Sequence, residues 1–116
     1  NFPAIELTLI KGNHDIISSH HFSMANIEVM DECAIGPFLL THDREESDLY
    51  NLHGHIHPAI RIKGRGRQSV RVPCFFFSEE YAVLPSCGDF TGSFVLAPKK
   101  GDAVFYPGET EVLRVF

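Results

Sequence analysis

Short apolar runs alternate with Gly, Pro or charged turns along the whole chain. Ile5–Ile10, Ile27–Met30 and Phe38–Thr41 are rich in β-branched or bulky apolar residues and are too short for comfortable helices, so each predicts a strand. Residues 16–26 mix Ser, His, Phe and Met without a clear period and predict a loop with at most a turn of helix. The first half of the chain is therefore expected to consist of strands that end in polar loops.

The second half has a β pattern throughout. Ile60–Lys63 and Val70–Val72 alternate apolar and polar residues on either side of Gly64-Arg65-Gly66, which predicts a hairpin. Five further strands are expected: Cys74–Phe77, Tyr81–Leu84, Ser93–Leu96, Ala103–Tyr106 and Val112–Phe116. No helical period appears here, so we expect the helices that cover such a sheet to precede this chain.

Length and composition indicate one globular domain, residues 1–116, with 44% hydrophobic residues and no apolar stretch that resembles a membrane span. Cys33, Cys74 and Cys87 form no Cys-x-x-Cys pair, which disfavours a disulfide framework or zinc ribbon and favours a reducing, cytoplasmic setting. The chain opens on Asn1 and runs directly into a strand without a secretory leader. We expect it to be the C-terminal portion of a longer protein.

The net charge of −5 is unevenly distributed: residues 1–60 carry nine acids and two bases, whereas residues 61–116 carry six acids and eight bases. An acidic half suits cations and a basic half suits phosphate. The bases Arg61, Lys63, Arg65, Arg67 and Arg71 all have odd numbers, so an extended chain projects them to one face. This ridge predicts phosphate contacts, with Arg65 and Arg67 binding substrate; the alternative is a solvated hairpin face whose charges discourage edge pairing.

Three histidine motifs stand at the ends of apolar runs: Gly12-Asn13-His14-Asp15, Thr41-His42-Asp43 and Gly54-His55-Ile56-His57. If the third motif is extended, His55 and His57 share a face roughly 6.6 Å apart, and their imidazoles can converge on two adjacent metals. The alternative is a pair of exposed strand histidines. The three motifs together point to a metal-dependent hydrolase.

The Asn-His-Asp loop adds two further kinds of group. The amide of Asn13 suits a two-metal site already crowded with charge, and Gly12 allows the loop to turn sharply. His14, held by Asp15, could protonate a leaving alkoxide or stabilise charge on phosphoryl oxygens. The alternative for this loop is a polar turn that caps a helix. His42 taken alone is more often a hydrogen-bonded histidine at a strand end than a ligand, and it gains weight from the other two motifs.

The order of these motifs resembles the last three motifs of the calcineurin-like metallophosphoesterases. Leu9–Asp15 and Gly54–Phe77 look like the DNA-ligase-associated branch of that superfamily, found in bacteria beside a ligase, a helicase and an exonuclease. The resemblance implies an α+β, mostly β fragment that supplies about half of a two-sheet β-sandwich flanked by helices.

The resemblance also implies a ligand set. Asn13, His42 and His55 would bind one divalent metal and His57 a second, with His14 acting on the phosphoryl group. Mixed nitrogen and oxygen ligands favour Mn, Fe or Zn. The family's upstream Asp-x-His and Gly-Asp-x-x-Asp motifs are absent from this sequence, so we expect the fragment alone to lack a complete site.

The leading hypothesis is therefore a phosphodiesterase or nuclease-like enzyme that hydrolyses phosphate esters in bacterial DNA repair, alongside a DNA ligase and a helicase. The alternative is a non-catalytic metal-dependent scaffold or nucleic-acid-binding module with the same fold. Presence of the two upstream motifs in the parent protein would favour catalysis, and their absence the scaffold. The sequence leaves an oligomer open and predicts no membrane partner.

Overall fold

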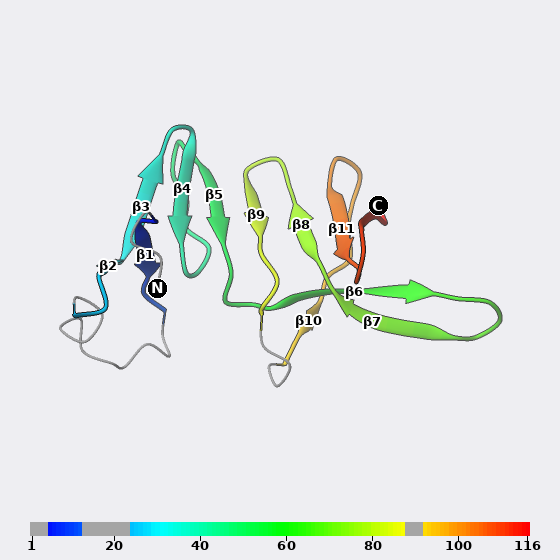
Figure 1. Ribbon diagram of the computed structural model, residues 1–116. Coiled ribbons are helices and arrows are strands. Elements are labelled where there is room, and N and C mark those ends of the chain that lie inside the picture. The colour runs from blue at the N-terminus through cyan, green and yellow to red at the C-terminus, as the bar shows by residue number, and fades with distance from the viewer. Residues whose placement is uncertain (1–4, 13–23, 88–91) are drawn as a thin grey trace.

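The computed structural model describes residues 5–12, 24–87 and 92–116, and within these ranges the chain forms strands in three sheets and no helical element (Figure 1). The strands are β1 (Leu7–Ile10), β2 (Ile27–Met30), β3 (Glu32–Ile35), β4 (Phe38–Thr41), β5 (Tyr50–His53), β6 (Pro58–Lys63), β7 (Ser69–Pro73), β8 (Phe75–Phe77), β9 (Tyr81–Val83), β10 (Phe94–Val95), β11 (Ala103–Pro107) and β12 (Val112–Arg114). No helix in this part of the chain is long and apolar enough to span a bilayer.

The largest sheet has seven strands in the order β12-β11-β8-β9-β5-β4-β3. Its centre is parallel, because β5 pairs in the same direction with β4 on one side and β9 on the other, while the remaining pairs are antiparallel. Parallel neighbours end at the same edge of a sheet. The segments that follow β4 and β5 therefore emerge side by side.

Two smaller sheets accompany the large one. β1 and β2 form a parallel pair with Leu7 opposite Ile27. β6 and β7 form the predicted antiparallel hairpin, and β10 adds to β6 in parallel. Figure 1 shows this hairpin crossing the end of the large sheet and projecting away from it.

The buried core lies on β8, β9 and β11. Phe76, Val83 and Val104 pack together with the buried thiol of Cys74, and Ile60 of the hairpin packs against them. Burial raises the pKa of Cys74 to about 11, so the thiol is neutral at physiological pH and behaves as a small apolar side chain.

The expected helix-flanked α+β sandwich half is wrong for the described residues, which form three sheets without a helix. The physical reason is the spacing of the turns: Gly, Pro or charged segments interrupt the chain before an apolar run reaches the roughly ten residues that a helix needs. The pattern also missed β3, because Glu32–Ile35 is a mostly exposed edge strand without apolar alternation. A tight turn at Gly36, whose φ is 54°, connects β3 to β4 and allows the two strands to pair.

Asn51 fixes the segment that follows β4. Its side chain is fully buried, donates from Nδ2 to the Leu39 carbonyl (3.0 Å) and to Thr41 Oγ1 (2.8 Å), and accepts at Oδ1 from the Glu45 amide (3.0 Å). Thr41 Oγ1 in turn donates to the Asp43 carbonyl (2.6 Å). One amide side chain thus holds β4, β5 and the loop between them.

We expect Asn51→Ala to lower the free energy of unfolding by about 2–3 kcal/mol, because buried hydrogen-bond partners lose the group that satisfies them. Urea denaturation measures the effect, and the exposed Glu109→Ala serves as the control, with an expected change within about 0.5 kcal/mol. Equal stability of the two variants would refute the role given to Asn51.

Candidate metal centre

The parallel pairing of β4 and β5 brings two of the predicted histidine motifs together. Leu40 of β4 lies opposite Leu52 of β5, and the pairing continues past the strand ends, where the Gly54 amide donates to the His42 carbonyl (3.0 Å). The Ile56 amide then donates back to the Gly54 carbonyl (2.8 Å), closing a tight turn.

That turn corrects the expected geometry of the His-x-His segment. His55 and His57 have φ values of 67° and 51°, in the left-handed region that side chains other than Gly seldom adopt. The segment is therefore not extended, and its histidines do not share a face by strand alternation. Such backbone strain costs on the order of 1–3 kcal/mol per residue and concentrates at functional sites.

His42 and His55 face one another through ring nitrogens. His42 Nε2 lies 2.9 Å from His55 Nδ1, and the rings meet edge to face with centroids 4.8 Å apart. Two imidazoles that bind one zinc-like ion at 2.0–2.1 Å in tetrahedral geometry have their nitrogens about 3.3 Å apart. The observed spacing is about 0.4 Å shorter and has the geometry of a hydrogen bond, with a proton on either nitrogen, so a shared cation would require the two rings to separate and turn.

The chain just before the Asn-His-Asp loop packs directly on the His42 ring. A methyl group at Gly12 would lie 2.7 Å from His42 Nδ1 and 2.8 Å from its Cε1, so only glycine allows the backbone this close. Asn13, His14 and Asp15 lie outside the described residues, and their assignments stay predictions.

His57 is held by the segment that leads into β10. Its Nδ1 donates to the Gly92 carbonyl (3.0 Å), since a carbonyl can only accept, and its own carbonyl accepts from the Phe94 amide (3.0 Å). In a neutral ring this leaves the lone pair on Nε2, the arrangement typical of a metal-binding histidine whose other nitrogen is anchored to a carbonyl.

His53 is a further histidine that the sequence reasoning did not single out. It is only 3% exposed, donates from Nδ1 to the Gly54 carbonyl (3.0 Å), and leaves its buried Nε2 without a hydrogen-bond partner. Burial lowers the pKa of His53, which keeps the ring neutral. The sequence signal for His53 is its alternation with Asn51, since two polar residues two positions apart lie on the same, buried face of β5.

In the described ranges no three His, Cys, Asp or Glu side chains come close enough to hold one ion. The structure thus brings His42 and His55 together, with Asp43 Oδ2 4.0 Å from His55 Nε2, and leaves His57 outside that group.

Arg65 and Arg67 lie in the exposed turn between β6 and β7, at the far end of the projecting hairpin (Figure 1). β6 begins directly after His57 and runs outward, so this turn lies at the end of the hairpin farthest from His57, and the substrate contacts of Arg65 and Arg67 stay a prediction.

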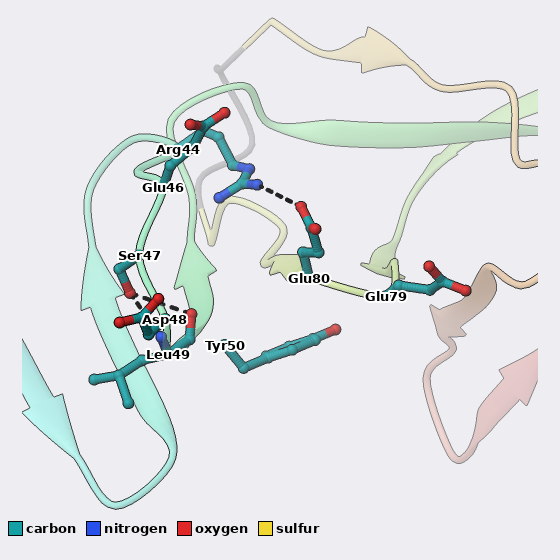
Figure 2. Close-up of a pocket in the computed structure, with 8 residues that line it drawn as sticks. All are labelled: Arg44, Glu46, Ser47, Asp48, Leu49, Tyr50, Glu79 and Glu80. Atoms are coloured by element: carbon teal, nitrogen blue, oxygen red, sulfur yellow. Dashed lines mark hydrogen bonds and ion pairs between the residues drawn. The ribbon is translucent and has the colours of Figure 1, made fainter.

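A cavity of about 520 Å³ lies elsewhere, at the opposite end of β5 (Figure 2). It is lined by Arg44, Glu46, Ser47, Asp48, Leu49, Tyr50, Glu79 and Glu80. Arg44 pairs with Glu80 at 3.5 Å and lies over the Tyr81 ring at 4.6 Å. The other three carboxylates give the cavity a negative wall that disfavours phosphate.

The fold resembles a solved nuclease. The crystal structure of Pseudomonas putida nuclease MPE superposes with a TM-score of 0.79 and 29% sequence identity, over 96% of this chain and 54% of that one. The present chain thus spans about half the length of that nuclease. No protein-family model and no curated protein matches the sequence.

This likeness is consistent with the metallophosphoesterase resemblance at the level of the fold. The DNA-ligase-associated branch, the metals and the site residues stay predictions.

We expect Gly12→Ala to push the His42 ring away from His55 and to lower the free energy of unfolding by about 1–3 kcal/mol, as overpacking does. Imidazole ¹H–¹⁵N spectra should show shifted signals for both rings. Gly64→Ala is the matched control, because its methyl would meet nothing closer than 3.8 Å. Unshifted His42 signals in Gly12→Ala would contradict the close packing.

Proposed function

We propose that this chain contributes part of the active site of a metal-dependent phosphoesterase of the nuclease type, with phosphodiesters as substrates. One observation carries the proposal: His42 Nε2 and His55 Nδ1 converge to 2.9 Å at the ends of two parallel strands. The similarity to nuclease MPE supports the same class of reaction.

The proposed ligands follow the family resemblance. Asn13, His42 and His55 would hold one divalent ion and His57 a second, and this donor set suits Mn, Fe or Zn. Such ions, when bound, lower the pKa of water and neutralise phosphoryl oxygens. The Gly92 carbonyl fixes the ring of His57 so that its Nε2 is the nitrogen available to a ligand.

Other residues of the chain would act on the substrate. His14 would donate a proton to the leaving oxygen, and Asp15 would orient its ring. Arg65 and Arg67 would contact phosphates at the end of the hairpin, away from the reacting bond. A role in bacterial DNA repair beside a ligase and a helicase is the cellular setting that we propose for this activity.

Removal of either paired histidine should abolish hydrolysis. In the full-length protein with Mn²⁺, we expect His42→Ala and His55→Ala each to reduce turnover of an aryl phosphodiester at least about a hundredfold, since even outer-shell partners of metal ligands contribute 10- to 100-fold. Thermal denaturation verifies folding, and Lys99→Ala, an exposed site outside the proposed machinery, is the control.

Full activity in both histidine variants would reject the proposed site. A wild-type protein that binds DNA but hydrolyses nothing with Mn, Fe or Zn would instead establish the binding-module alternative.

Removing the two arginine charges of the hairpin turn should change the salt dependence of DNA binding. If Arg65 and Arg67 each contact a phosphate, Arg65→Gln/Arg67→Gln should reduce the slope of log K against log salt by about 1.8, because each contact contributes about 0.9. Fluorescence anisotropy over a salt series gives the slope. An unchanged slope would return both residues to the solvated-hairpin interpretation.

A further inference from the structure

The projecting hairpin concentrates the positive charge of an acidic protein. Residues 61–71 hold five of the ten Lys and Arg of the chain and none of its fifteen Asp and Glu. We refer to residues 58–73 as the basic arm. Its cations are exposed, and among the described residues none of them forms an ion pair with a carboxylate.

The strand register sorts the arm into two faces. Arg61 lies directly opposite Arg71, with Lys63 two residues further along the same face. Ile60 and Ile62 face the other side; Ile60 contacts the core. The arginines thus point away from the side that packs on the body of the protein.

An Arg–Arg pair across two strands is unfavourable unless something lies between the two charges. Directly opposite residues have Cβ atoms about 4.5–5.5 Å apart, a distance at which like charges destabilise a hairpin. Two guanidinium groups at that spacing can both donate to one phosphate, which converts the repulsion into a bridged contact. Arg71 Nη1 also lies 3.4 Å from Ser93 Oγ, a contact that limits where its side chain can go.

We propose that Arg61 and Arg71 form a phosphate clamp through which the basic arm holds a DNA backbone that extends away from His57. The clamp lies three residues beyond Pro58, the first residue of β6 after His57, which at about 3.3 Å per strand residue is about 10 Å. This length corresponds to about three base-pair steps of duplex DNA. The stated distance from the site of hydrolysis rests on the proposed function, whereas phosphate binding by Arg61 and Arg71 does not.

The shape of the arm favours a nucleic acid over a compact anion. Its cations follow one extended strand pair, where residues two apart are separated by roughly 6.6 Å, rather than surrounding one pocket. A linear polyanion can meet all of them in sequence, and each phosphate neutralised releases bound counterions. A two-stranded ribbon is also narrow enough to enter the DNA major groove.

The test is binding of a 24-base-pair duplex in EDTA, which makes the result independent of catalysis. Arg61→Gln/Arg71→Gln should weaken binding about tenfold at 0.15 M salt and reduce the salt slope by about 0.9. Lys99→Gln/Lys100→Gln removes the same charge from an exposed turn outside the arm and should leave the affinity within twofold. The aryl phosphodiester assay of the unmodified protein reports separately on the proposed function.

A second variant separates folding from binding. Arg61→Glu places opposite charges across the strands, so the melting temperature should hold or rise while DNA binding falls about tenfold or more. Equal losses in the arm and control double variants, or unchanged binding in Arg61→Glu, would overturn the clamp. Competition by polyglutamate as effective as that by DNA would also overturn it, in favour of an acidic protein partner.

Discussion

The candidate site depends on the parallel alignment of β4 and β5. Antiparallel pairing would send the ends of these strands to opposite edges of the sheet and separate His42 from His55. Parallel pairing instead brings them together, and the buried Asn51 joins β5 to β4 through two hydrogen bonds and to the returning loop through a third. A buried polar residue of β5 therefore helps to fix the position of the candidate site.

Around this alignment the structure holds several unfavourable local arrangements. His55 and His57 are left-handed, the Nε2 atom of His53 is buried without a partner, and Gly12 leaves no room for a side chain beside His42. Each is costly in a region that serves only stability. Their concentration around the His42–His55 contact and the turn after β5 supports a functional interpretation more strongly than the presence of histidines does.

Much of the fold could be predicted from the sequence, because Gly, Pro and charged turns mark strand ends and the hairpin register follows from alternation. The exposed edge strand β3 could not, since Glu32–Ile35 carries no apolar pattern. The meeting of His42 and His55 was predicted by motif order, but its cause, parallel strand pairing, is a long-range property. The left-handed conformation of His55 and His57 likewise depends on backbone hydrogen bonds that no local pattern encodes.

The charges divide the molecule along β5. Its first residue, Tyr50, borders the acidic cavity, whereas the turn after its last residue, His53, leads to His57 and the basic arm. A polyanion is repelled from the first end and attracted to the second, because fields from clustered charges extend over about a Debye length, roughly 8 Å at physiological salt. Under the proposed function, this asymmetry would favour approach of a DNA strand along the arm toward His57. The short segment from Gly54 to Pro58 joins the arm to the histidine pair, so the placement of the candidate ligands and the placement of the positive charge depend on the same turn.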